Sequence, residues 1–251
     1  MSAELTESDM SRRETRSRSA DDEQPRRRMV DIVVPVFNEE AYIDELIARI
    51  EKLGLSDSLI FVDNGSTDGT VDRILRHREV RLVRHEQNQG YGASIRHGIE
   101  FGDAEIVVII DGDLEYQPEE IPLLLDSLSE HPVVFCSRWL RPENNPALYL
   151  RRFGNRTMTT LFNWLYGQRV TDLYTGMKGF RRDALPLHSL TRNGFEHAVE
   201  FAAMTAMSGH NIHEIPVEYR PRQLGDSKMR HVPEALKLGF FLLVFRLPRR
   251  R

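Results

Sequence analysis

Residues 105–115 read EIVVIIDGDLE, and this stretch indicates the class of fold most directly. Five apolar residues in a row, 106–110, are followed at once by Asp111 and Asp113, with Glu115 two residues further on. A strand that is apolar on both faces is typical of the centre of a parallel sheet, and the carboxyl ends of such strands face the crevice where α/β proteins bind ligands. We therefore expect an α/β protein in which these acidic side chains converge at one edge of the sheet.

The three carboxylates are candidate metal ligands. Carboxylates that crowd at one strand end repel one another, and a bound cation removes that repulsion. Oxygen ligands suit Mg²⁺ or Mn²⁺, so Asp111, Asp113 and Glu115 are predicted to bind one of these ions. A polar Asp-Gly turn after a buried strand, without any metal, would have the same sequence pattern. For this stretch alone the two interpretations have equal weight, and motifs elsewhere in the chain favour the metal site.

Strands and helices alternate along most of the chain. Apolar runs predict strands at 30–37, 59–63, 80–83, 106–110 and 133–137. Helical spacing predicts helices at 41–53, 70–76, 93–101 and 119–128. Such alternation predicts a mostly parallel, Rossmann-like sheet covered by helices on both faces. A second half, with helices at 148–166 and 196–208 and a strand at 212–219, is expected to close over the carboxyl edge of that sheet.

Composition bounds the domain organisation. The chain has 251 residues, 40% of them hydrophobic, and a formal net charge of −4, which argues against a nucleic-acid partner. Residues 1–28 hold seven arginines, seven acidic residues and few large apolar side chains, so we expect a disordered tail followed by one folded domain at 29–228. Cys136 is the only cysteine, which excludes an intramolecular disulfide and favours a reducing, cytoplasmic setting.

The carboxyl end, 229–251, joins a short apolar run to a group of arginines. From Asp226 onward the chain has seven Lys or Arg and two acidic residues. A basic amphipathic helix of this kind could lie peripherally on a membrane surface, and a terminal helix docked on the domain would have the same sequence. Both interpretations stay open. We expect no membrane-spanning helix, because no apolar stretch approaches the roughly 20 residues that one needs.

Six polar segments mark the ends of predicted elements. They are 35–40 (PVFNEE), 63–69 (DNGSTDG), 88–92 (NQGYG), 111–113 (DGD), 171–182 (TDLYTGMKGFRR) and 219–228 (YRPRQLGDSK). Their order and spacing resemble family 2 glycosyltransferases, which have the GT-A fold. Within that family the chain is similar to the dolichol-phosphate mannosyltransferase group, which glycosylates polyprenyl phosphates. The resemblance covers residues 29–228.

The resemblance implies a nucleotide-sugar donor, GDP- or UDP-linked, bound along the strand ends. The residues at the matching positions are Pro35, Asn38, Glu39, Asp63, Gly65, Gly90, Gly92 and Asp111. Glycines just before a helix let the backbone approach a diphosphate and present amide donors to it. Asp63 can accept hydrogen bonds from a base or ribose, although an Asx turn or a helix cap would also use an aspartate there. Asn64 stands where many relatives have a second aspartate.

The resemblance also implies roles for the metal and acceptor residues. Asp111 and Asp113 match the motif that binds the cation bridging the donor's phosphates, and Glu115 stands where many relatives have glutamine. The residues matched to the acceptor phosphate are Arg138, Arg152, Arg222 and Lys228. Arginine suits this task because its guanidinium binds phosphate through two parallel hydrogen bonds. Asp172 matches a residue near the transferred sugar, where it could orient hydroxyls or act as a base, and Glu200 is a second acidic candidate.

These residues predict an inverting hexosyltransferase that moves one sugar from a nucleotide sugar to a polyprenyl phosphate, with Asp111, Asp113, Asp172 and Arg222 as its catalytic residues. The main alternative is metal-dependent transfer to a hydroxyl of a soluble metabolite or glycan, with Asp172 or Glu200 as base. A sugar nucleotidylyltransferase should carry a Gly-rich phosphate loop directly after the first strand, and 35–40 is not such a loop. The two retained aspartates argue against a non-catalytic binding protein.

Overall fold

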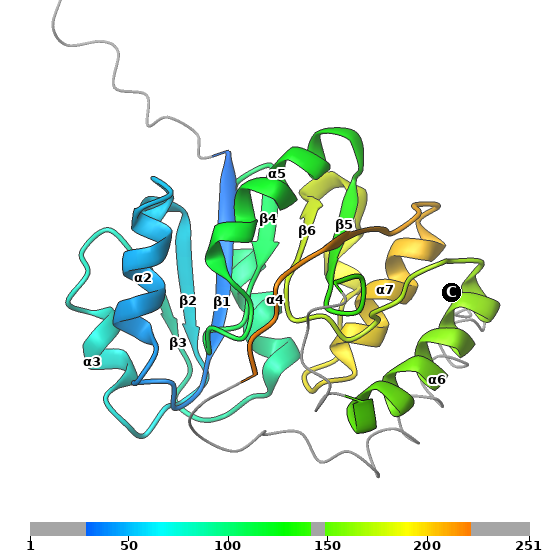
Figure 1. Cartoon of the computed structure of the whole chain (residues 1–251). Coiled ribbons are helices and arrows are strands. Elements are labelled where there is room, and N and C mark those ends of the chain that lie inside the picture. The colour runs from blue at the N-terminus through cyan, green and yellow to red at the C-terminus, as the bar shows by residue number, and fades with distance from the viewer. Residues whose placement is uncertain (1–28, 142–148, 222–251) are drawn as a thin grey trace, which may run out of the picture.

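The computed structural model describes residues 29–141 and 149–221, which form a mixed α/β fold around one sheet (Figure 1). The strands of the sheet lie in the order β3-β2-β1-β4-β6-β5-β7. Their bounds are β1 Val30–Val36, β2 Leu59–Asp63, β3 Arg81–Arg84, β4 Ile106–Ile109, β5 Val133–Ser137, β6 Lys178–Arg181 and β7 His213–Pro216. Each strand predicted from an apolar run is present within a few residues of its expected bounds.

The first half of the sheet is parallel, as predicted. β1 pairs with β2 from Ile32↔Leu59 to Val36↔Asp63, and with β4 from Val30↔Ile106 to Val33↔Ile109. β2 pairs in parallel with β3. Because parallel strands end at the same edge, the segments that follow β1, β2 and β4 meet there. This edge carries the first four polar segments of the sequence.

β6 is a strand that the sequence pattern did not predict. Its four residues, KGFR, include two cations and show no apolar run, so the local pattern does not indicate a strand. β6 lies antiparallel between β4 and β5, with Lys178 opposite both Ile109 and Phe135. Hydrogen bonding to two neighbours holds a short strand whose own side chains would not indicate one.

Helices cover both faces of the sheet (Figure 1). The helices are α2 Ile43–Glu51, α3 Thr70–Ile74, α4 Tyr91–Phe101, α5 Ile121–Glu130, α6 Tyr149–Tyr166 and α7 His197–Met207. Short 3₁₀ helices are η1 Ser56–Ser58, η2 Pro118–Glu120, η4 Arg182–Ala184 and η5 Leu187–Ser189. Residues of α2, α3 and α5 share one buried core with one face of the sheet, and residues of α4, α6 and α7 share a second core with the other face. None of the helices described here combines the length and the apolar character needed to cross a membrane.

A buried ion cluster fastens the amino ends of the strands. Asp31 of β1 is fully buried, and its carboxylate contacts Arg81 of β3 at 2.7 Å and Arg182 of η4 at 3.0 Å. The same carboxylate accepts a hydrogen bond from Ala104 N–H at 2.8 Å. Its charge and both its oxygens are therefore satisfied, which a buried carboxylate requires. The cluster lies at the opposite edge from the polar segments.

Candidate active site

The loops that follow β1 and β2 are tied to each other by hydrogen bonds. Asn38, whose φ is 54°, donates its N–H to Ser66 Oγ at 2.9 Å and accepts from Thr67 N–H at 2.8 Å through Oδ1. Glu39 donates its N–H to Thr70 Oγ1 at 2.9 Å. Asn38 and Glu39, both predicted to line a nucleotide site, thus hold the two loops together. Pro35, predicted with them, is buried within β1.

Asp63 ends β2 with one carboxylate oxygen engaged and one free. Oδ1 accepts a hydrogen bond from Ser66 N–H at 3.1 Å, which is the local turn expected of an aspartate here. Oδ2 is buried and has no hydrogen-bond partner, although the side chain is only 1% exposed. Buried polar atoms without partners are rare in native proteins and call for a ligand or water. Gly65 follows with a φ of 80°, and a Cβ there would lie 2.8 Å from the Gln87 backbone.

Asn64 is the centre of a buried polar network. Its Oδ1 accepts from Gln89 N–H at 2.8 Å and lies 3.1 Å from His85 Nδ1, while its Nδ2 donates to Asn88 at 3.0 Å. His85 Nε2 in turn lies 2.9 Å from His97 Nδ1. Burial and the neighbouring His97 lower the pKa of His85. Asn64, which stands at the position of the expected second aspartate, therefore supports the loop that leads into α4.

Gly90, just before α4, and Gly92, in its first turn, pack against the protein itself. A Cβ on Gly90 would lie 2.3 Å from Asn193 O, and one on Gly92 would lie 2.3 Å from Arg192 O. Ala93 N–H, one of the first amides of α4, donates to Asn193 O at 3.1 Å. The close approach that these glycines permit is thus to residues 192–194 in this structure. These residues, here named the 192–194 strap, cover the start of α4, where the sequence predicts amide groups presented to a diphosphate.

Glu200 of α7 holds the same strap in place. Its carboxylate accepts hydrogen bonds from the N–H groups of Thr191 at 3.0 Å and Arg192 at 2.9 Å, and from the Thr191 hydroxyl at 2.9 Å. The side chain is fully buried. Both oxygens of this candidate base therefore already accept hydrogen bonds from Thr191 or Arg192.

Asp111 and Asp113 lie together just beyond β4. Tyr91 of α4 donates its hydroxyl to Asp111 Oδ1 at 2.7 Å, and a Cβ on Gly176 would lie 1.9 Å from Oδ2. Asp113 is buried and accepts Glu115 N–H at 3.1 Å. Burial, and then the charge of Asp113, raise the pKa of Asp111 to about 7. Two neighbouring carboxylates, one with a raised pKa, are a setting in which cation binding is favourable.

Glu115, the third predicted metal ligand, contacts another side chain in this structure. Glu115 Oε2 accepts the hydroxyl of Tyr219 at 2.6 Å. Within residues 29–141 and 149–221, no three His, Cys, Asp or Glu side chains come together as ready metal ligands. The donor set at Asp111 and Asp113 still fits Mg²⁺ or Mn²⁺, because these ions are often held by one or two carboxylates together with substrate phosphates.

Arg138 and Asp172 form a buried, two-point ion pair. Arg138 Nε donates to Asp172 Oδ2 at 2.7 Å and Arg138 Nη2 donates to Oδ1 at 2.7 Å. Asn155 of α6 donates to Oδ1 at 2.8 Å. Although burial opposes it, the charge of Arg138 and these hydrogen bonds lower the pKa of Asp172 below its usual value. The guanidinium also lies 5.4 Å from the ring centroids of Trp139 and Tyr219.

The remaining predicted acceptor residues lie outside the described part. Arg222 and Lys228 fall after residue 221, and the described part of the α6 helix includes the backbone of Arg152 but not its side chain. Arg220 N–H donates to Glu115 O at 2.8 Å, so the chain leads into this basic motif directly beside the acidic loop. Two buried residues of this region, Lys178 and His197, were not predicted as site residues.

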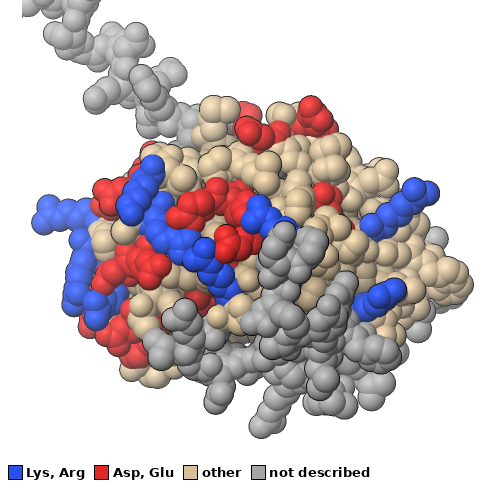
Figure 2. Space-filling view, viewed as in Figure 1, with Lys and Arg blue, Asp and Glu red and all other residues tan. Residues whose placement is uncertain are grey.

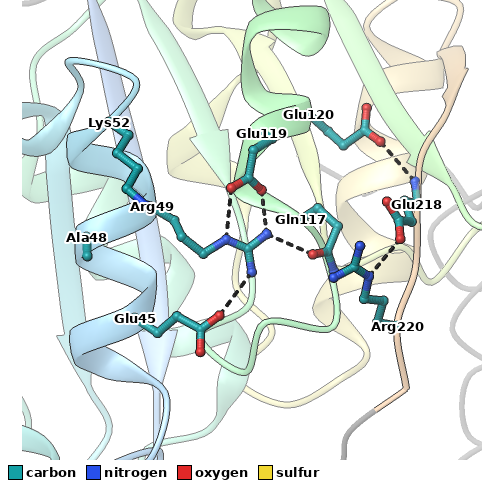
Figure 3. Close-up of a pocket in the computed structure, with 9 residues that line it drawn as sticks. All are labelled: Glu45, Ala48, Arg49, Lys52, Gln117, Glu119, Glu120, Glu218 and Arg220. Carbon is teal, nitrogen blue, oxygen red and sulfur yellow. Dashed lines mark hydrogen bonds and ion pairs between the residues drawn. The ribbon is translucent and has the colours of Figure 1, made fainter.

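A polar groove of about 560 Å³ lies apart from the acidic pair, between α2 and the segments at 117–120 and 218–220 (Figure 3). Acidic and basic side chains alternate across this side of the molecule (Figure 2). Arg49 donates to Gln117 at 2.8 Å and to Glu119 at 2.9 Å, and Arg220 donates to Glu218 at 2.7 Å. The groove contains neither of the clustered aspartates, and the ion pairs within it occupy most of its charges.

Comparison with known proteins matches residues 31–186 to the family Glycosyl transferase family 2. The chain is 32% identical over 200 residues to the dolichyl-phosphate hexose transferase of Haloferax volcanii, covering 79% of this chain and 85% of that protein. It is 28% identical to the undecaprenyl-phosphate mannosyltransferase of Micrococcus luteus, covering 78% and 86%. Glucosyl-3-phosphoglycerate synthase from Mycobacterium tuberculosis, solved with Mg²⁺ and UDP, shares the fold with a TM-score of 0.67 at 23% identity, covering 87% of this chain and 78% of that one.

Proposed function

Because this chain belongs to glycosyltransferase family 2, we propose that it transfers one sugar from a nucleotide sugar, GDP- or UDP-linked, to a polyprenyl phosphate. The names of two relatives, a dolichyl-phosphate hexose transferase and an undecaprenyl-phosphate mannosyltransferase, support this acceptor class. Contact with a lipid acceptor places the reaction at a membrane surface. A membrane contact through residues 229–251 stays a prediction from the sequence.

The donor half of the proposal is supported at the carboxyl edge of the sheet. Asp111 and Asp113 would hold Mg²⁺ or Mn²⁺, which when bound offsets negative charge on the departing diphosphate. Asp63 Oδ2 is buried without a partner and can accept a hydrogen bond from the base or ribose. The loops tied by Asn38 and Glu39 keep this oxygen in place.

The contacts of the two candidate bases, Asp172 and Glu200, are the observation that favours a phosphate acceptor. A hydroxyl acceptor needs a base, whereas a phosphate acceptor is already ionised at neutral pH. Asp172 is bound by Arg138 and Asn155, and its pKa is lowered. Glu200 is buried and holds the 192–194 strap. The oxygens of both carboxylates already accept hydrogen bonds, so the proposed site suits an acceptor oxygen that attacks the anomeric carbon as an anion while the bond to the diphosphate breaks.

A comparison of acceptors tests the proposal. The enzyme is incubated with Mn²⁺ and a panel of UDP- and GDP-hexoses, together with a short-chain prenyl phosphate, the matching prenol, or 3-phosphoglycerate. Mass spectrometry should detect a glycosylated product from the prenyl phosphate alone. Equal product from the prenol would replace this proposal with the hydroxyl-acceptor alternative. Product from 3-phosphoglycerate alone would assign the chain a soluble phosphorylated acceptor instead.

A further inference from the structure

Lys178 is a buried lysine without a counter-ion. Its side chain is 1% exposed, and its Nζ lies 5.1 Å from the ring centroid of Phe135 and 5.6 Å from that of Phe201. Among the residues that the structure describes, the ammonium makes no hydrogen bond or ion pair. Burial lowers its pKa to about 8. An unpaired buried cation is costly, and a protein that retains one generally uses it.

His197 and Arg96 bring further unpartnered atoms to the same place. His197 opens α7, is 1% exposed, and has no hydrogen-bond partner at either ring nitrogen. Arg96 of α4 donates from Nη2 to Asn193 at 2.9 Å, whereas its Nη1 is buried without a partner. Burial, followed by the positive charges of Lys178 and Arg96, lowers the pKa of His197 to about 3. The ammonium of Lys178, the buried Nη1 of Arg96 and a neutral imidazole, from three different elements, therefore lie near one another.

This region adjoins the acidic pair. Lys178 lies opposite Ile109 in the sheet register, two residues before Asp111, and the negative charges of Asp111 and Asp172 both act on its ammonium. A Cβ on Gly92 would lie 2.5 Å from His197 Cβ, and the preceding Tyr91 donates to Asp111. The region thus lies on the face of the sheet that α4 and α7 cover, next to the proposed donor.

The charges around Lys178 and Arg96 indicate the sign of a ligand that would bind them. A divalent cation offsets the charges of Asp111 and Asp113, and Asp172 is offset by Arg138. Among the described residues, neither Lys178 nor Arg96 then has a carboxylate in direct contact, and the buried carboxylate of Glu200 is bound by N–H and hydroxyl donors instead. Buried donors are nearly always satisfied in native proteins, so the complement of this group is an anion with several acceptor oxygens.

We propose that Lys178, Arg96 and His197 form a subsite for an oxyanion of the sugar donor, either an oxygen of its diphosphate or the carboxylate of an acidic sugar. The inference rests on the donor half of the proposed function and is independent of the acceptor. In the bound state the Lys178 ammonium and Arg96 Nη1 donate to the anion, and the neutral imidazole donates from one ring nitrogen.

Binding measurements with Lys178→Met test the subsite. Calorimetry with Mn²⁺ compares UDP, UDP-glucose and UDP-glucuronate, or the GDP-linked set if the wild type prefers guanine. Loss of one charge-assisted hydrogen bond should weaken the affected ligand by about tenfold or more. An equal loss for all three ligands assigns the anion to the diphosphate. A loss confined to UDP-glucuronate assigns it to the sugar carboxylate. Unchanged affinity for all three would overturn the proposal.

Control measurements distinguish a ligand-binding role of Lys178 from a structural role, and the donor subsite from the proposed acceptor site. Lys52→Met replaces an exposed lysine and should leave every affinity unchanged. Methionine removes a buried charge at similar volume, so the Tm of Lys178→Met should equal or exceed that of the wild type. Should that variant not fold, Arg96→Met gives the same comparison, and Arg96→Lys should recover part of the affinity. A wild-type protein that binds neither UDP nor GDP would overturn both this subsite and the proposed donor, whereas a failed acceptor assay leaves the subsite intact.

Discussion

Asp172 is fully buried, and its oxygens are held by Arg138 on one side and by Asn155 on the other. The backbone N–H of Asp172 is engaged as well, because it donates to Glu214 at 2.9 Å. A residue type that suggests a catalytic base is thus part of a structural ion pair that positions a guanidinium. At the scale of single residues, partners rather than residue type decide what a carboxylate can do.

The substitution Asp172→Asn should lower the free energy of unfolding by about 3 to 5 kcal/mol, because it removes the charge that offsets the largely buried Arg138 guanidinium. Urea denaturation followed by circular dichroism measures the change. Asp126→Asn, at an exposed position of α5, is the matched control and should change stability by less than about 0.5 kcal/mol. A loss below about 1 kcal/mol for Asp172→Asn would show that the pair is not important for stability.

The substitution Asp113→Ala should abolish Mn²⁺-dependent nucleotide binding without lowering the Tm of the metal-free protein. Removing one of two repelling carboxylates relieves strain in the absence of metal, while the metal loses a ligand. Calorimetry with UDP or GDP, with and without Mn²⁺, measures the first effect and thermal melting the second. Metal-dependent binding at wild-type affinity would contradict the assignment of Asp113.

At the scale of elements, α4 begins beneath the 192–194 strap, and α7 holds that strap through Glu200. Tyr91, the first residue of α4, stacks on Phe195 with ring centroids 5.5 Å apart and donates to Asp111. The start of one helix therefore connects the strap to the acidic pair. Glycine is required at 92 because the strap's backbone occupies the space of a side chain.

The substitution Gly92→Ala should lower the Tm by several degrees, although alanine is favoured over glycine within a helix by about 1 kcal/mol. The added methyl group would lie 2.3 Å from Arg192 O and must displace the strap. Differential scanning fluorimetry measures the change, with Thr160→Ala on the exposed side of α6 as control. A raised Tm would mean that the strap yields readily and that helix propensity prevails.

At the scale of the whole molecule, the two edges of the sheet have different tasks. At the amino edge the carboxylate of Asp31 is paired with the guanidinium groups of Arg81 and Arg182. At the carboxyl edge Asp111 lies beside Asp113, and burial together with the charge of Asp113 raises the pKa of Asp111 to about 7. The ion pairs at the amino edge thus stabilise the fold, whereas the acidic charges at the carboxyl edge need a ligand.

This asymmetry predicts a pH dependence. The pKa of Asp111 is about 7 in the folded protein and 3.8 as its ordinary value, so the folded state holds the proton more tightly. Its contribution to stability is complete below about pH 4 and is lost as the pH rises through about 7. Relative to Asp111→Asn, the Tm of the metal-free wild type should therefore fall across this interval. Mn²⁺ with nucleotide should reverse the trend, since the metal binds the ionised form. A Tm difference independent of pH would refute the assignment.

The sequence alone determined the features that depend on local patterns. Apolar runs and helical spacing located most strands and all the major helices described, because each pattern lies within a few consecutive residues. The six ordered polar segments led to family 2 of the glycosyltransferases, which the comparison with known proteins confirms. The acidic pair after β4 followed from the same reasoning, since parallel strands place their ends at a common edge.

Only the tertiary structure decided which side chains remain available for chemistry. The β6 strand is held by ladders to β4 and β5, whose residues are distant in the sequence. The Arg138–Asp172 pair and the strap over Gly92 join segments 34 and about 100 residues apart. The burial of Lys178 against Phe135 of β5 and Phe201 of α7 likewise depends on residues that are distant in the sequence. A charge's partner and its exposure are set by neighbours in space, and no periodicity in the chain records them.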